Sequence, residues 1–271
     1  MRTKTLVATL SLVLFQTVAN AASTPSPMTP SGPWHVEYAG SMCLLSRPYG
    51  TNPNVRLILK PSMIGDELEI IVSTDRSWYT KWQSGSVAIT IADKPVADQV
   101  NFDAYSTARQ RLVRIGSDSE TLTLAALRDT LSIDAKREGH YQFALPGIER
   151  ARPALNSCLA QLRTMYNVTK ADLAPIVTEP QAKIWKFFRS SDYPLEALNK
   201  RQSGRVGVLL WVESTGLVSK CEVIERIDAP VLEQQTCSIL QSRGRFTAAK
   251  DAAGRSIRAP VTTRLNWQLP Y

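Results

Sequence analysis

The stretch Gly204-Arg205-Val206-Gly207-Val208-Leu209-Leu210-Trp211-Val212 decides how the last third of the chain folds. Its period-two spacing is typical of a β-strand, because successive side chains point to opposite faces of a sheet. The turn residues Ser214-Thr215-Gly216 follow, and Gly216 can adopt the positive φ that lets the next strand fold straight back. We therefore predict a hairpin whose second strand spans residues 217–227.

Helix signals flank this hairpin, and a final strand follows. Tyr193-Pro194 precedes a short helical pattern that ends at Lys200. Asp228-Ala229-Pro230 can cap and start a longer helix, because Asp accepts a backbone N–H bond and Pro has no N–H to lose. The spacing of apolar residues over 231–240 is helical. With a last strand over residues 258–269, the order helix, strand, strand, helix, strand predicts a compact α+β module.

The order and the residues of this module resemble the TonB C-terminal domain family. Members show Tyr-Pro before a small helix, Gly-x-Val-x-Val on the first strand, Gly-x-Val at the hairpin, and Arg-x-Phe with small residues before the last strand. The corresponding pieces here are Tyr193-Pro194, Gly204-Arg205-Val206-Gly207-Val208, Gly216-Leu217-Val218 and Arg243 through Ala249, with Thr247 where Pro is common. The resemblance covers only the last third of the chain.

The resemblance implies that the last strand binds an extended peptide at the edge of a three-stranded antiparallel sheet. An edge strand has unpaired backbone groups, to which a guest segment can add itself as a further strand. The implied partner is a TonB-dependent receptor peptide or another envelope protein. Carried over to this sequence, the binding residues are Tyr193, Pro194, Val261, Thr262, Thr263, Arg264, Leu265, Asn266 and Trp267. Alternatively, the odd-numbered residues of this strand form a core face and the even-numbered ones are solvated; strand addition, which uses backbone, is compatible with both.

The first 21 residues have the features of a secretory signal peptide. Arg2 and Lys4 precede an apolar run over residues 6–18, and Ala19-Asn20-Ala21 fits a cleavage site. The run is short for a bilayer span, which needs roughly 20 residues. We expect export to the periplasm with cleavage, which would leave 250 residues and lower the net charge from +8 to +6. An uncleaved inner-membrane anchor is the alternative.

The rest of the chain divides by composition. Residues 22–33 are rich in Pro, Ser and Thr and predict a flexible leader. Residues 34–166 predict a β-rich domain of unknown role, with a helical pattern near residues 119–128 and a closing helix from Ile148. Residues 167–192 form a connector that includes a possible amphipathic helix at 182–189, and residues 193–271 form the TonB-like module. The predicted fold class is α+β, with a β-rich N-terminal domain closed by a helix and a small module.

Four cysteines give an even count, which in an exported chain predicts two disulfides with three formal pairings. The domain division favours Cys43 with Cys158 and Cys221 with Cys237. Closing a loop of about 15 residues stabilises the fold by roughly 3 kcal/mol in the chain-entropy model. The spacing is not Cys-x-x-Cys, so these bonds are interpreted as structural.

Catalytic motifs are missing from the sequence. The two histidines, His35 and His140, stand alone, and no Gly-x-Ser-x-Gly elbow, His-Glu-x-x-His helix or phosphate-binding Gly loop occurs. We therefore expect no enzyme, no metal site and no cofactor, and a carboxylate-pair glycosidase is the enzyme alternative. The carboxylates interpreted as solvent-facing strand residues are Glu67, Glu69, Glu222 and Glu225.

Three functions follow from these observations. The first is a periplasmic adaptor that binds an envelope protein by strand addition. The second is an energy transducer for TonB-dependent transport, which would need an uncleaved anchor and the long Pro-rich linker that a folded domain replaces here. The third is a non-catalytic wall- or lipid-binding protein, based on the basic surface and on the aromatic residues Trp185, Phe187 and Phe188, although packing of these rings against a domain is the favoured interpretation. A basic exported protein meets anionic wall polymers or lipid headgroups more readily than nucleic acid.

Overall fold

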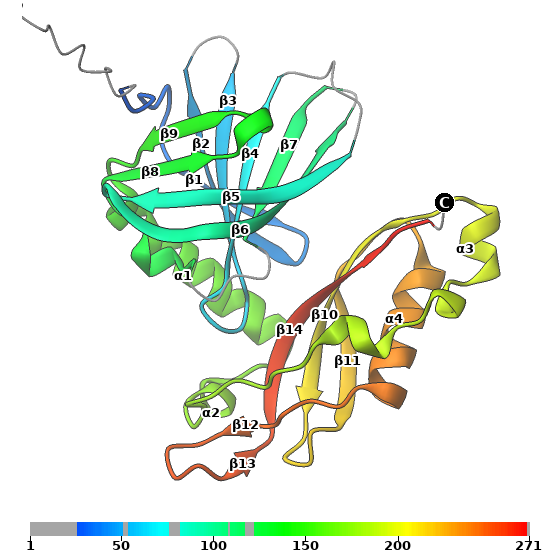
Figure 1. Ribbon diagram of the computed structural model, residues 1–271. Coiled ribbons are helices and arrows are strands. Elements are labelled where there is room, and N and C mark those ends of the chain that lie inside the picture. The colour runs from blue at the N-terminus through cyan, green and yellow to red at the C-terminus, as the bar shows by residue number, and fades with distance from the viewer. Residues whose placement is uncertain (1–25, 51–53, 76–81, 108, 117–121, 270–271) are drawn as a thin grey trace, which may run out of the picture.

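The computed structural model describes residues 26–50, 54–75, 82–107, 109–116 and 122–269. It contains a large curved antiparallel sheet with one long helix, and a smaller sheet covered by a second helix (Figure 1). The predicted α+β class is confirmed. The predicted signal peptide lies outside the described residues, and no helix within the described ranges is long and apolar enough to span a membrane.

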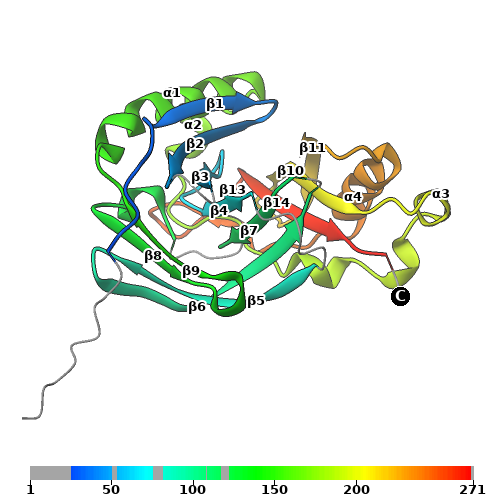
Figure 2. The same ribbon diagram turned by 90° about the horizontal axis from the view of Figure 1, so that it is seen from above.

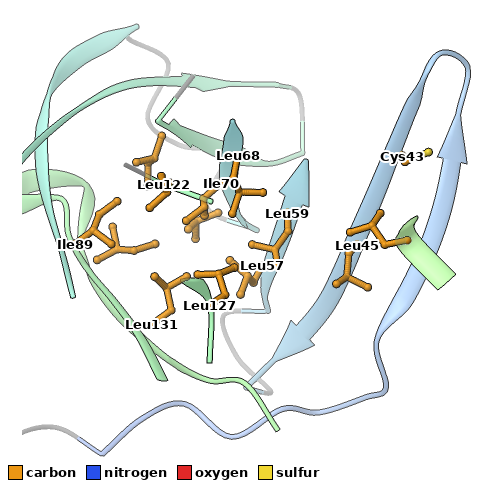
Figure 3. Close-up of a cluster of buried hydrophobic side chains, with 14 of the residues drawn as sticks. Cys43, Leu45, Leu57, Leu59, Leu68, Ile70, Ile89, Leu122, Leu127 and Leu131 are labelled. Atoms are coloured by element: carbon orange, nitrogen blue, oxygen red, sulfur yellow. The ribbon is translucent and has the colours of Figure 1, made fainter. Parts of the chain in front are cut away.

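The large sheet has nine strands in the order β1-β2-β3-β4-β7-β6-β5-β8-β9, and every neighbouring pair is antiparallel. The strands are β1 (His35–Ala39), β2 (Met42–Tyr49), β3 (Val55–Pro61), β4 (Leu68–Thr74), β5 (Gln83–Ile91), β6 (Lys94–Ser106), β7 (Arg111–Ile115), β8 (Thr130–Asp134) and β9 (His140–Ala144). Alternation of buried and partly exposed residues, as in β7, turns one set of side chains inward. Leu57, Leu59 and Ile70 are among the inward side chains that fill the interior (Figure 3).

A segment before β1 connects the two sides of this sheet. The Met28 N–H donates to Gln142 of β9 at 2.6 Å, and the Ser31 N–H donates to Pro48 of β2 at 3.0 Å. The expected flexible leader is therefore wrong for residues 28–31, because their backbone groups are paired on both sides. We call the sheet with this closing segment the barrel.

Helix α1 (Ile148–Met165) packs against β1 and β2, and the Cys43–Cys158 disulfide fixes it there, in the pairing that the sequence favoured. The helix expected near residues 119–128 is wrong where it can be checked, since 117–121 lie outside the described residues. Only the 3-10 turn η1 (Leu124–Ala126) forms, because the Thr123 side chain caps it and the flanking Leu122 and Leu127 both enter the core. A second turn, η2 (Lys136–Glu138), precedes β9.

The C-terminal region begins with a connector and ends in a sheet of order β11-β10-β14. Its elements are α2 (Lys170–Leu173), η3 (Ile184–Phe187), η4 (Ser190–Asp192), α3 (Leu195–Asn199), β10 (Gly204–Val212), β11 (Val218–Glu225), α4 (Pro230–Arg243), β12 (Ala249–Lys250), β13 (Ser256–Ile257) and β14 (Ala259–Trp267). From α3 to β14 this is the predicted order helix, strand, strand, helix, strand, with the short β12–β13 pair inserted before the last strand. The Cys221–Cys237 disulfide joins β11 to α4.

Two local expectations for this region were wrong. Asp228 does not cap α4; its N-cap is Ala229, and the Glu233 carboxylate accepts the Ile227 N–H at 2.8 Å instead. The amphipathic helix expected at 182–189 is the short turn η3. Gln181 exchanges backbone hydrogen bonds with Thr247, which holds the connector extended up to that turn.

The small sheet is covered on both faces. One face carries Val206, Val208 and Leu210, which pack with Leu232 of α4 in the core of the module. The other face contributes Leu209, Trp211 and Ile224 to the core of the barrel. The small sheet therefore lies between α4 and the barrel (Figure 2).

Candidate functional site

Strand β14 is one edge of the small sheet. It pairs with β10 over nine consecutive residue pairs, from Gly204–Trp267 to Val212–Ala259, without a bulge. Within the part of the chain that the structure describes, no backbone hydrogen bond joins β14 to a strand other than β10. The side of β14 away from β10 is therefore an edge in the sense that the sequence predicted.

The register shows which backbone groups of β14 point away from the sheet. The Glu213 N–H donates to Leu217 on the β11 side at 2.8 Å. Backbone groups alternate in direction along a strand, so the even-numbered residues of β10 face β14 and bond its odd-numbered residues. We infer that Thr262, Arg264 and Asn266 present their N–H and C=O groups outward.

The other edge of the sheet, β11, is less regular. Its pairing with β10 shifts register twice, between Gly207 and Val208 and between Trp211 and Val212. It also carries the charged side chains Lys220 and Glu222. Bulges and charges are features that protect edge strands from pairing, so β14 is the better acceptor for an added strand.

Aromatic side chains lie at the end of β14. The Tyr193 and Phe188 rings pack edge-on against the Trp267 ring, at centroid distances of 5.2 and 5.8 Å. The Tyr193 hydroxyl donates to the Gln202 carbonyl, and burial raises the pKa of this phenol. Pro194 is the N-cap of α3. The structure thus places Tyr193 against the end of β14, with Pro194 next to it in the chain.

The other two aromatic side chains of the connector, Phe187 and Trp185, differ in their packing. Phe187 contacts Phe246 at a centroid distance of 6.0 Å, whereas Trp185 is 68% exposed with the Lys186 ammonium over its ring. Packing against a domain, the favoured interpretation, therefore holds for Phe187 and Phe188 but not for Trp185.

Two open cavities lie along β14. One, of about 580 Å³, runs beside residues 261–263, with the connector on one side and Glu67 of the barrel on the other. The second, of about 550 Å³, lies beside Asn266 and Trp267, with Trp82 and Tyr105 of the barrel opposite. Residues of the barrel line both cavities, and residues of the connector line the first; we call the two cavities together the groove along β14.

The even-numbered side chains of β14 lie on the face that packs against the barrel. The hydroxyls of Thr262 and Ser62 are 2.6 Å apart, and Arg264 Nε donates to Glu225 Oε1 at 2.8 Å. The alternative in which these side chains are solvated is therefore wrong for Thr262 and Arg264, because the barrel covers this face; Asn266 is exposed.

A buried cluster of charges holds the barrel against β14. The fully buried Glu69 carboxylate accepts from Arg114 Nε at 2.9 Å and from Arg205 Nη1 at 2.9 Å, and Lys60 Nζ lies at 3.2 Å. Burial alone would raise the pKa of Glu69, but these three cations outweigh it and hold the pKa well below its usual range. The interpretation of Glu69 as a solvent-facing residue is wrong, since its strand lies under the small sheet.

Glu225 completes the cluster. Its carboxylate contacts Lys60 Nζ and Arg264 Nε, each at 2.8 Å, and these cations lower its pKa against the opposing effect of burial. Glu225 and Arg264 both pair with Gly207 in the register, and a Cβ on Gly207 would lie 2.7 Å from Glu225 Cβ. The Glu225 side chain is only 10% exposed, so its interpretation as a solvent-facing residue is wrong, and the missing side chain at Gly207 gives this ion pair its space.

No group of three or more His, Cys, Asp or Glu residues within the described ranges is placed to hold a metal ion. The carboxylates that do converge, Glu69 and Glu225, each form ion pairs with lysine and arginine side chains. These ion pairs link the barrel to the small sheet.

Residues 189–269 match the family model described as Gram-negative bacterial TonB protein C-terminal. The resemblance predicted from the sequence is confirmed for this region. The match indicates a TonB-like envelope protein whose C-terminal domain takes part in protein interaction, in a family of interaction domains rather than enzymes. A search of curated proteins finds no match to the chain.

Proposed function

We propose that the protein binds an extended segment of another envelope protein, such as a TonB-dependent receptor, as an additional strand on β14. The observation that carries this proposal is the regular nine-residue edge, with outward backbone groups at Thr262, Arg264 and Asn266 beside an open groove. Main-chain hydrogen bonds, each worth about 0.5–1.5 kcal/mol net, would supply much of the affinity.

We further propose that the protein acts as a periplasmic adaptor rather than as an energy transducer. Leu209 and Trp211 of β10 belong to the core of the barrel, and the buried Glu69 cluster ties the two bodies together. A module held in this way cannot extend on a long linker as the energy-transducing members do. Mass spectrometry of the natural protein tests this choice, because an adaptor would start near Ala22 and an anchored transducer at its first residues.

A proline on the edge of β14 tests strand addition. Asn266→Pro removes an outward N–H from an exposed position that tolerates proline on an edge strand, whereas Asn266→Ala loses the same side chain and keeps the N–H. Nine-residue peptides would be selected on the wild-type protein from a phage-displayed random library, synthesised, and titrated calorimetrically into the three proteins.

The proline variant should bind the selected peptides at least about tenfold more weakly than the alanine variant, because one backbone bond and the close approach of the guest are lost. Far-UV circular dichroism would verify that both variants are folded. Equal affinities of folded Asn266→Pro and Asn266→Ala would contradict strand addition at β14.

A further inference from the structure

We propose that the barrel forms the second wall of the groove along β14 and that this groove selects acidic extended peptides. The proposal rests on strand addition at β14 and assigns a role to the N-terminal domain. Both cavities that flank the edge are lined by residues of the barrel as well as by residues of the C-terminal region.

At the Asn266 end of the groove the barrel contributes aromatic and basic groups. Trp82, which is 48% exposed, and Tyr105 line the same cavity as Asn266. Arg114 of the barrel and Arg205 of β10 line the same cavity, with side chains that are 17% and 15% exposed. A guanidinium has five N–H donors, so an arginine bonded to Glu69 can also bind a second carboxylate.

At the Thr262 end the basic groups come from the connector and from the loop after α4. The exposed side chains of Lys183, Lys186 and Arg245 line this cavity, and Glu67 lines it from the barrel. A guest strand beside Thr262 would therefore pass between three basic side chains and one acidic side chain.

The charges of the whole groove favour an anionic guest. The basic side chains in the two cavities and the cluster beneath them are Lys60, Arg114, Lys183, Lys186, Arg205, Arg245 and Arg264. The acidic side chains there are Glu67, Glu69, Asp103 and Glu225. Glu67 and Asp103 have partners within the protein. Even when each of them is counted as a full negative charge, the basic side chains outnumber the acidic ones. A positive groove raises the affinity for acidic segments and lowers it for basic ones.

The barrel wall is in place before a guest arrives. Glu69 binds Lys60 and Arg114 of the barrel and Arg205 of β10, and Ser62 contacts Thr262. A wall that is already positioned costs less conformational entropy on binding, so its contacts with the guest count more fully toward affinity.

Two synthetic peptides test the charge selection. Each has nine residues of alternating valine and threonine, with a fluorescent label and either glutamate or lysine at both ends, so that the result does not depend on strand direction. Titrations followed by fluorescence anisotropy use the full chain at low salt. The acidic peptide should bind at least about tenfold more tightly than the basic one, and the preference should shrink as salt is added. Lys183→Glu should reduce the preference for the acidic peptide severalfold. The same change on the opposite edge of the sheet, Lys220→Glu, should leave this preference unchanged.

Tryptophan variants test the barrel wall. Trp82→Ala should weaken binding of the acidic peptide at least about fivefold, and Trp185→Ala, which removes an exposed tryptophan of the connector, should not. Equal binding of the two peptides, or wild-type affinity in Trp82→Ala while Asn266→Pro still weakens binding at least about tenfold, would overturn this inference and leave strand addition standing. If neither peptide binds, both this inference and the proposed function are contradicted.

Discussion

Replacing Glu69 by glutamine should greatly destabilise the protein. The change keeps the shape of the side chain but removes the charge on which Lys60, Arg114 and Arg205 converge. Because the carboxylate is completely buried, water cannot replace it as a partner for the three cations. The neutral amide also presents N–H donors to groups that are themselves donors.

The expected loss is about 3–5 kcal/mol of unfolding free energy, the range for removing one partner from a buried ion pair. Typical domains have a total stability of about 5–15 kcal/mol, so this is a large fraction. Glu196→Gln provides the control. It removes the Glu196–Lys200 pair, whose side chains are 59% and 60% exposed, and should cost less than about 1 kcal/mol.

Urea unfolding followed by tryptophan fluorescence would measure both variants, since Trp211 lies where the small sheet meets the barrel. A loss for Glu69→Gln that is within about 1 kcal/mol of the control would refute the reasoning, because it would mean that the three cations do not depend on this carboxylate.

Three further predictions concern the same contact and the module beside it. Gly207→Ala should lower the unfolding free energy by about 1–3 kcal/mol, because the new Cβ would lie 2.7 Å from Glu225 Cβ, and an unchanged urea midpoint would contradict this. The pKa values of Glu69 and Glu225 lie below 4.5, the ordinary value for glutamate, so both carboxylates stabilise the fold above pH 4.5. The unfolding free energy of the wild type should therefore be constant from pH 7 to about pH 5 and fall at lower pH. Urea titrations over that range should show a shallower fall for Glu69→Gln, and parallel curves would count against the assignment. Replacing both Cys221 and Cys237 by alanine should cost roughly 3 kcal/mol in thermal or urea unfolding, given their separation of 16 residues, and a loss near zero would show that the disulfide adds little.

The fold of the C-terminal module could be predicted because its signals are local. Alternation of apolar residues marks β10, and Pro230 marks the start of α4. Gly216 has φ of 83°, and a Cβ there would collide with the Phe246 carbonyl, so the turn requires glycine. Each of these features depends on residues close in sequence.

The packing of the module against the barrel could not be predicted in the same way. Glu69 is buried because β3 and β7 flank its strand and the small sheet covers its position, and nothing in the sequence near Leu68-Glu69-Ile70 separates a buried carboxylate from a solvated one. The β-rich prediction for residues 34–166 also did not resolve the strands β6 and β7. β6 carries Pro95 and several polar residues, and β7 pairs with β4, a strand distant in the chain.

The candidate site, too, could be predicted only in part from the sequence. The residues of β14 came from the family resemblance, which identifies the strand without its surroundings. Which backbone groups face outward follows from the register with β10, and the groove depends on barrel residues that line both cavities and on connector residues that line one of them. Trp82 and Tyr105 lie far from β14 in sequence, so they carried no signal for a role at its edge.

Amide hydrogen exchange measured by NMR on the complex with the tightest selected peptide tests the central claim most directly. We predict that the amides of Thr262, Arg264 and Asn266 become at least about tenfold slower to exchange when the peptide binds. The amides of Thr263 and Leu265, already bonded to β10, should be protected in both states. Unchanged exchange at the three outward amides, or new protection along β11 instead, would contradict the claim that β14 accepts a guest strand.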